Sequence, residues 1–227
     1  VGHVLDRPRS VGVHDDVDLS RVTWSRGGYE RAALERVYTG NDARVAKVIE
    51  QVRRRVPDVS RMRALGFCVG VEHARFMAER FRAAGIPAAA IDASTGGDER
   101  ADVLRKLRDR ELNVVFAADL FNEGVDVPEV DTVLFLRPTE SATVFLQQLG
   151  RGLRRAPDKP CLTVLDFIGA QSRRFRFDAR HAALLSCARA DVERHVDDGF
   201  PFLPAGCHME LDRVAARVVL DNLRAAV

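Results

Sequence analysis

The sequence predicts an α/β fold in which a parallel β-sheet is covered by helices on both faces. Five short apolar runs separate stretches with helical spacing: Leu65–Val69, Ala88–Ile91, Val114–Ala117, Val133–Leu136 and Leu162–Leu165. Strands buried on both faces read as continuous apolar runs, and parallel strands need crossover connections, usually helices. The composition agrees, because 46% hydrophobic and 30% charged residues are typical of a globular chain and exclude a disordered one.

The segment before the first run predicts a helical leader, residues 1–61, packed on the main domain. Residues 1–20 are predicted to be irregular and partly acidic, and a short helix is expected to end near Val37. Asn41 is a suitable N-cap for a second helix. Apolar residues then recur at helical spacing, at Val45, Val48, Ile49, Val52 and Val56.

The five runs and their helices predict a main domain over residues 62–170. Its first helix carries an apolar face, formed by Ala74, Met77, Ala78 and Phe81, and Asp98 is expected to cap the next helix. Residues 141–149 are also predicted to be helical. Residues 171–227 form a predicted helical extension, with helices expected over 175–187 and 211–223.

Net charge, cysteine content and hydropathy limit the classes of protein to which the chain could belong. A net charge of +2 does not by itself require a polyanionic partner. The four cysteines form no C-x-x-C pair, which favours reduced, buried thiols and a cytoplasmic protein. We find no transmembrane-length apolar stretch, no signal peptide, no zinc-type spacing and no G-x-S-x-G motif, so no metal site is expected.

Ligands of open parallel sheets bind beyond the carboxyl ends of the strands, so we searched the segments that follow the runs. Arg151 and Arg154 lie three residues apart, and on a helix they would project from one face and suit a polyphosphate. Gly150 would allow a close backbone approach. An equally good interpretation is a solvated basic helix end.

Three further segments are candidates. Asp126, in a turn made by Gly124, could accept hydrogen bonds from ribose hydroxyls, although an ordinary turn is the commoner interpretation. Thr95, Gly96 and Arg100 could bind a phosphate at a helix start, or form a simple capped glycine turn. Glu72 and His73 lie at another helix start, where a carboxylate is often only a cap that complements the helix dipole, and for His73 we favour a structural role over a catalytic one.

Three of these segments occur in an informative order. FCVGVEHA, ADLFNEGVDVPEVD and QQLGRGLR resemble motifs IV, V and VI of superfamily 2 helicases of the DEAD/DEAH type. The chain looks closest to bacterial members with extra C-terminal regions, and the resemblance covers nearly its whole length. It implies that residues 62–170 are the second, RecA-like helicase C-terminal domain.

The resemblance also implies roles for single residues. Arg151 and Arg154 match the motif VI arginines that reach the γ-phosphate across an interdomain cleft, and Gln147 matches the first residue of that motif. Gly124 and Asp126 match the motif V pair near the ribose. Ala118 departs from the family, because many relatives have a threonine there that contacts the nucleic-acid backbone.

The chain lacks the other half of such an ATP site. Its three lysines follow Ala46, Arg105 and Asp158, so no G-x-x-x-x-G-K-[ST] loop exists. Its one Asp-Glu pair, Asp98-Glu99, does not follow an apolar strand. The expectation is a chain that neither hydrolyses ATP nor unwinds nucleic acid alone. It would need an N-terminal RecA-like domain, which would make most of the contacts to ATP and Mg²⁺, and DNA or RNA as the nucleic acid that it binds.

Two other classes of function remain open from the sequence. One is a non-catalytic nucleic-acid-binding or protein-interaction module on a RecA-like fold. The other is a complete small-molecule α/β enzyme, which the lack of a glycine-rich first turn disfavours. The basic run Arg173, Arg174 and Arg176 could contact phosphates or form a solvated face.

Overall fold

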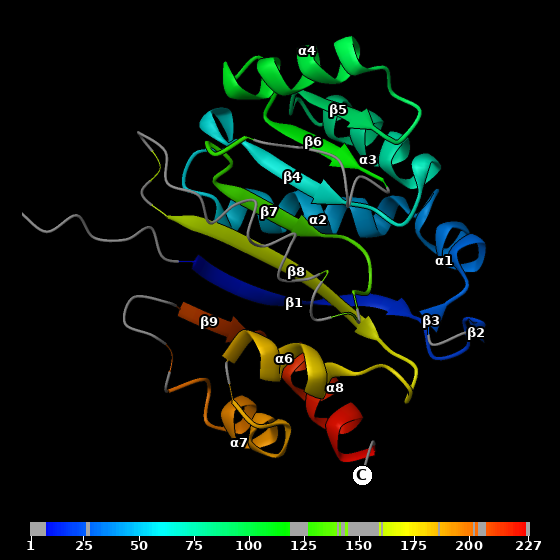
Figure 1. Cartoon of the computed structure of the whole chain (residues 1–227), viewed down its shortest axis with the longest axis vertical. Coiled ribbons are helices and arrows are strands. Elements are labelled where there is room, and N and C mark those ends of the chain that lie inside the picture. The colour runs from blue at the N-terminus through cyan, green and yellow to red at the C-terminus, as the bar shows by residue number, and fades with distance from the viewer. Residues whose placement is uncertain are drawn as a thin grey trace, which may run out of the picture.

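The fold is built on one sheet of seven parallel strands (Figure 1). The computed structural model describes residues 8–25, 28–118, 127–139, 141, 144, 159, 161–185, 187–201, 203 and 208–225. In spatial order, the strands are β5 (Ala88–Ile91), β6 (Val114–Ala117), β4 (Ala64–Phe67), β7 (Thr132–Phe135), β8 (Leu162–Ala170), β1 (Pro8–Asp18) and β9 (His208–Leu211). The five apolar runs are therefore confirmed as strands β4 to β8.

Seven helices belong to the described part of the chain: α1 (Arg31–Tyr38), α2 (Asp42–Arg55), α3 (Val71–Ala83), α4 (Gly97–Arg108), α6 (Phe177–Leu185), α7 (Val192–Asp197) and α8 (Arg213–Ala225). Short 3₁₀ turns span Val59–Arg61 and Arg189–Asp191, and an antiparallel hairpin joins β2 (Trp24–Ser25) to β3 (Gly28–Tyr29). None of the helices in the described ranges is long and apolar enough to cross a membrane.

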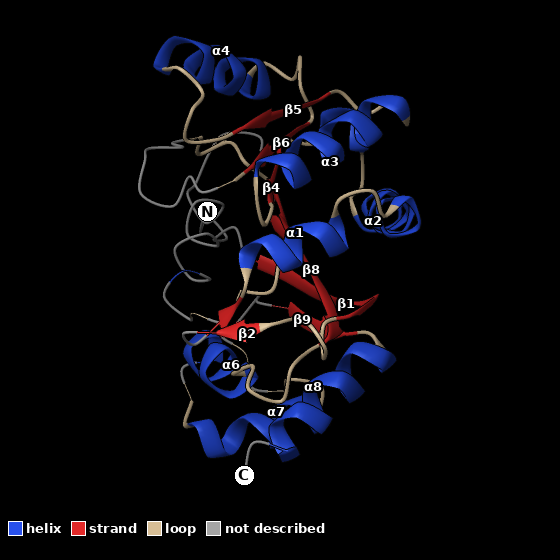
Figure 2. Ribbon diagram, turned by 90° about the vertical axis from the view of Figure 1, so that its right-hand side faces the viewer, coloured by secondary structure: helices blue, strands red, loops and turns tan. Residues whose placement is uncertain are grey.

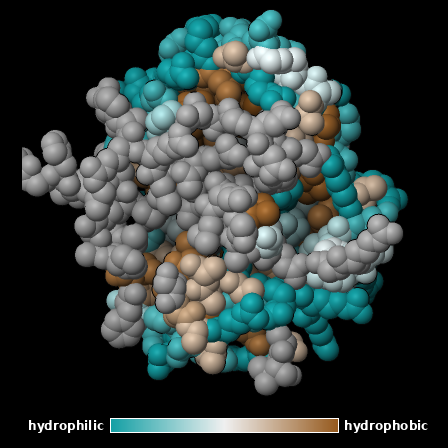
Figure 3. Space-filling model, in the orientation of Figure 1, coloured by the Kyte–Doolittle hydropathy of each residue, from teal (hydrophilic) through white to brown (hydrophobic). Residues whose placement is uncertain are grey.

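Helices cover both faces of the sheet, as predicted (Figure 2). On one face α2 and α3 bury their apolar stripes, including Val48, Met77 and Phe81, against the strands. On the other face Leu104 and Leu107 of α4 pack on the sheet. Helices α6, α7 and α8 form a separate cluster beside β8 and β9. The solvent side of α4 is hydrophilic (Figure 3).

Two helix starts test the expected caps. The side chain of Asn41 accepts a hydrogen bond from the Arg44 amide at 3.0 Å, which confirms Asn41 as the N-cap of α2. The expected cap at Asp98 is wrong. Helix α4 begins at Gly97 with Gly96 as its N-cap, so Asp98 already lies in the first turn, where its charge still suits the helix dipole.

The prediction that residues 1–20 are irregular is also wrong. Pro8–Asp18 forms β1, which lies between β8 and β9 and pairs in parallel with both. Its alternating Val11 and Val13 are buried, whereas the carboxyl group of Asp15 is neutralised by a cation on α2. The acidic residues made this segment resemble a loop. The strands that pair with it, β8 and β9, lie more than 140 residues later, so nothing in the local sequence indicated the pairing.

The sheet takes strands from all three segments into which the sequence was divided, because β9 lies in the predicted helical extension. Helices α6 and α8 lie close to the expected ranges 175–187 and 211–223. Cys68, Cys161 and Cys187 are free thiols. Only Cys68 is fully buried, which raises the pKa of its thiol, so the expectation of buried cysteines holds for one of these three.

Candidate functional site

Two of the segments that carry candidate residues begin close together, at the carboxyl edge of the sheet. Strands β6 and β7 end at Ala117 and Phe135, and only β4 lies between them. Strands in a sheet lie about 4.8 Å apart, so these two ends are separated by roughly 10 Å. Residues 118–126 leave one strand end, and the segment that contains the paired arginines leaves the other.

Six of the predicted site residues lie outside the described residues: Gly124, Asp126, Gln147, Gly150, Arg151 and Arg154. Their roles therefore stay predictions. Ala118, the last described residue before Gly124 and Asp126, is buried, and its amide donates to the carbonyl oxygen of Ile91 at 3.1 Å. Its methyl side chain offers no hydroxyl to a nucleic-acid backbone.

The structure does bring Thr95, Gly96 and Arg100 together, in the turn between β5 and α4. One guanidinium nitrogen of Arg100 donates to the Thr95 carbonyl oxygen at 3.1 Å, and the Thr95 hydroxyl accepts from the Asp92 amide at 2.9 Å. A Cβ added to Gly96 would meet nothing within 4 Å. The start of α4 is therefore a fixed turn with open space around its N-cap.

The charge around this turn is mixed. The Asp92 carboxylate accepts hydrogen bonds from the side chain and the amide of Ser94 and lies 3.7 Å from Arg75. The Ser94 hydroxyl bond is the main reason why the pKa of Asp92 is lowered. Asp98 and Glu99 add two carboxylates in the first turn of α4. A phosphate would therefore be bound here by Arg100 and exposed amides, against opposing charge.

A second helix start on this edge is already occupied by an anion of the chain. The Glu35 carboxylate accepts hydrogen bonds from the amides of Glu72 and His73 at 3.0 and 3.4 Å, at the N-terminus of α3. A Cβ at Gly70, the N-cap, would lie 2.2 Å from Glu35 Oε1, so a larger residue there would displace the Glu35 carboxylate from this position. Glu72 itself is exposed and pairs with Arg75 at 3.3 Å.

His73 belongs to a buried cluster centred on Arg44. The Arg44 guanidinium donates to Asp15 at 2.7 Å and to the Leu136 carbonyl oxygen at 2.9 Å, and it lies 3.3 Å from His73 Nε2. It also covers the ring of Tyr38, 4.1 Å from the centroid. These contacts join β1, α1, α2 and α3 to the carboxyl end of β7.

The cluster holds His73 neutral. Burial, followed by the positive charge of Arg44, places the pKa of His73 well below its ordinary value. The ring stacks on Tyr38 with centroids 5.3 Å apart, and its Nδ1 accepts from the Val69 amide at 3.3 Å. These contacts support the structural role that the sequence favoured for His73.

Arg44 and Asp15 are the residues that sequence reasoning missed. Both are at least 95% buried, although charged residues are rarely found inside. One signal was present, because Arg44 stands four residues before Val48 and so shares the inward face of α2. The partner could not be found in the same way, because Asp15 lies on a strand that was not predicted.

Comparison with known proteins identifies the central part of the chain. Residues 47–156 match the family described as the helicase conserved C-terminal domain. IRC3 of Saccharomyces cerevisiae is 28% identical over 168 residues, which cover 74% of this chain and 24% of IRC3. The DNA 3'-5' translocase XPB2 of Sulfurisphaera tokodaii is 39% identical over 74 residues, which cover 33% of this chain and 17% of XPB2.

Solved structures show the same fold at low sequence identity. The yeast DEAD-box splicing factor Prp28 superposes with a TM-score of 0.60 at 14% identity, over 96% of this chain and 38% of Prp28. The C-terminal domain of the DEAD-box protein Dbp5 superposes with a TM-score of 0.54 at 12% identity, over 95% of this chain and 98% of that domain. By contrast, the chain spans about a quarter to a third of the first curated relatives.

Proposed function

We propose that this chain, whose residues 47–156 match the helicase conserved C-terminal domain, is the second RecA-like half of a superfamily 2 helicase and works in ATP-driven movement along nucleic acid. The chain would close on a first RecA-like domain when ATP binds and separate from it after hydrolysis. The observation that supports the proposal most directly is the common origin of the two candidate segments at the carboxyl edges of β6 and β7.

In this proposal the chain supplies the positive charge of the ATP site. Arg151 and Arg154 would stabilise the γ-phosphate in the transition state, with Gln147 beside them, while Gly124, Asp126 and Gly150 would hold the nucleotide from this side. Arginine fingers contribute roughly 10³–10⁵ to phosphoryl-transfer rates. Mg²⁺ and the phosphates would be bound mainly by the first domain, since this sequence has no lysine-bearing phosphate loop.

Nucleic acid would bind through its phosphates. We assign Thr95, Gly96 and Arg100 to this contact because the turn is fixed and open at the start of α4. Contacts of this kind depend on salt rather than on sequence. The division into 1–61, 62–170 and 171–227, and a cytoplasmic location, also remain proposals.

The test is ATP hydrolysis by the chain alone and joined to its first RecA-like domain. We expect no turnover from the chain alone, and turnover stimulated by single-stranded nucleic acid from the joined protein. Arg151→Ala or Arg154→Ala should lower kcat at least a hundredfold with unchanged folding. Arg54→Ala, on an exposed position of α2, is the control and should leave kcat unchanged.

Two results would contradict the proposal. Turnover by the isolated chain that Arg154→Ala abolishes would mean that the ATP site is complete without a second domain. Unchanged kcat in both arginine variants of the joined protein would rule out the finger role and favour a non-catalytic binding module.

A further inference from the structure

A pocket of about 330 Å³ opens at the carboxyl ends of β4 and β7, between the β2–β3 hairpin and α1. Ligand pockets of proteins start at roughly 300 Å³, so this volume suits one small ligand rather than a helix or a strand. Part of its wall comes from outside residues 47–156, because Tyr29, Arg31 and Phe175 line it. Of the helicase motifs named above, only the FCVGVEHA segment contributes a described residue to the wall, through Val69.

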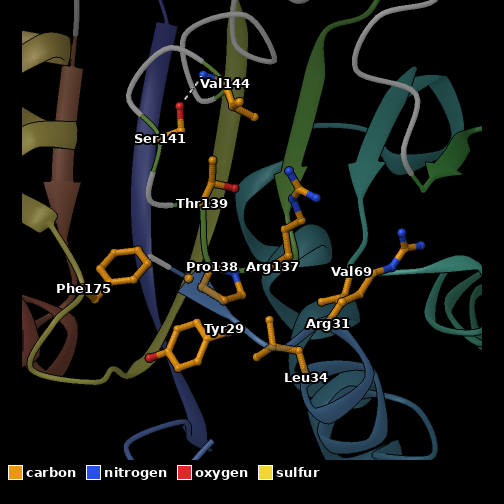
Figure 4. Close-up of a pocket in the computed structure, with 11 residues that line it drawn as sticks. Tyr29, Arg31, Leu34, Val69, Arg137, Pro138, Thr139, Ser141, Val144 and Phe175 are labelled. Carbon is orange, nitrogen blue, oxygen red and sulfur yellow. Dashed lines mark hydrogen bonds between the residues drawn. The ribbon is translucent and has the colours of Figure 1, made fainter. Parts of the chain in front are cut away.

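One end of the pocket is aromatic and apolar. Phe175, Tyr29, Pro138 and Leu34 gather there (Figure 4). Phe175 is buried, and the Tyr29 hydroxyl accepts from the Ser172 amide at 2.6 Å and donates to Gln171 Oε1 at 3.0 Å. The tyrosine ring is thus held in place before any ligand arrives, which favours a flat, rigid ligand group.

The other end of the pocket is polar. Thr139 and Ser141 lie there, and the Thr139 hydroxyl is directed towards the side of the pocket where the Arg137 guanidinium lies (Figure 4). Thr139 is 97% buried, and its Oγ1 has no hydrogen-bond partner among the described residues. A buried hydroxyl without a partner is costly, so a ligand acceptor at this place would remove a penalty.

We propose that the pocket binds one nucleoside phosphate, with the base against Tyr29 and the phosphate at Thr139, Arg137 and Arg31. The two ends supply the chemistry that each part of such a ligand needs, since stacking on an aromatic ring suits any base and guanidinium groups suit phosphate. The nucleoside phosphate is either one unit of a bound strand or a free nucleotide. The strand form rests on the proposed function.

The experiment measures binding to the whole chain by the fluorescence of Trp24, the one tryptophan in the sequence, whose ring lies 4.7 Å from that of Tyr29. The probes are dT12, a twelve-residue abasic strand with the same phosphates, and free dTMP. The base-binding pocket predicts at least fivefold weaker binding of the abasic strand, because stacking contributes about 1–3 kcal/mol per base.

Variants separate the pocket from general electrostatic binding. Thr139→Val should weaken dT12 binding about tenfold, whereas Thr139→Ser, which keeps the hydroxyl, should bind like the unmodified chain. Arg31→Gln, at the start of α1, should lower the slope of log K against log salt by about 0.7, and Arg54→Gln, near the C-terminal end of α2, should have a smaller effect. Thermal unfolding of each variant checks that it is folded.

Each result decides the proposal. Binding of dTMP that Thr139→Val weakens, with no binding of dT12, supports the free-nucleotide form even if the helicase proposal fails. If dT12 and the abasic strand bind equally well, and the folded Thr139→Val variant binds them as the unmodified chain does, the pocket proposal is overturned. The helicase proposal would remain intact. Binding of neither dT12 nor dTMP also overturns it.

Discussion

At the scale of single residues, the buried Arg44–Asp15 pair is the feature with the largest expected effect on stability. Both side chains are 2% exposed, and Arg44 is also bound to His73 and to the Leu136 carbonyl oxygen. Removing one member of a buried pair leaves the other charge without a partner, at a cost of about 3–5 kcal/mol. Exposed ion pairs contribute about 0–1 kcal/mol.

We therefore expect Arg44→Met to lower the free energy of unfolding by about 3–5 kcal/mol. The control is Lys47→Met on the same helix, which removes the exposed Lys47–Asp16 pair and should cost less than about 1 kcal/mol. Urea denaturation of both variants gives the two values. Equal losses would show that the buried cluster contributes no more than a surface pair.

The local sequence pattern predicted which strands carry the candidate site, but not which charged side chains are buried or paired around it. The order of motifs placed the candidates on strand ends. The structure confirms the end at Ala117 and places the other at Phe135, one residue before the predicted Leu136. It could not show that Glu35 would fill the N-terminus of α3, because that carboxylate comes from another helix 37 residues earlier. Long-range pairing of charges leaves no periodic signal in the sequence.

At the scale of elements, the sequence predicted the strands that are buried on both faces, but not the strands in which apolar and polar residues are mixed. Runs such as Val114–Ala117 are apolar throughout because helices cover both sides. Strand β1 alternates valines with polar residues, and β9 has only Met209 and Leu211 as apolar residues. Their sequences fit an irregular segment equally well, and only the neighbouring strands decide.

Helix α6 gives a prediction on pH. His181 on α6 is buried beside Arg180, whose guanidinium pairs with Asp166 of β8, and burial lowers the pKa of His181 to about 4. The unfolded chain, with an ordinary histidine pKa near 6.5, therefore takes up a proton that the folded chain refuses between pH 6.5 and 4. Stability should fall as pH falls, by about 3 kcal/mol in total from this group. His73 acts in the same direction.

The measurement is the free energy of urea unfolding between pH 7.5 and 4.5. His181→Leu should reduce the slope near pH 5 by about 1.4 kcal/mol per pH unit, because one fewer proton is taken up on unfolding. Val214→Ala, at an exposed position of α8 that carries no titratable group, should leave the slope unchanged. If His181→Leu does not alter the slope, a group other than His181 causes the loss of stability at low pH.

At the scale of the whole molecule, the sheet joins the two ends of the described chain into one structure. Strand β1 separates β8 from β9, and the Asp212 carboxylate at the start of α8 accepts from the His14 amide. Val11 and Val13 of β1 belong to the same core as α2 and α3. The structure therefore predicts that the family-matched segment 47–156 depends on strands outside it.

Removing residues 1–19 should consequently prevent cooperative folding. Without β1, strands β8 and β9 lose their shared partner and the apolar faces of Val45 and Val48 lose part of their cover. We expect the full chain to melt in one transition, and residues 20–227 to show a broad melt, retained helical circular dichroism and binding of a hydrophobic dye. A synthetic peptide of residues 1–20 should restore the transition, because it returns the missing strand. A truncated chain that melts sharply within a few degrees of the full chain would instead make β1 an accessory strand on an independently stable domain.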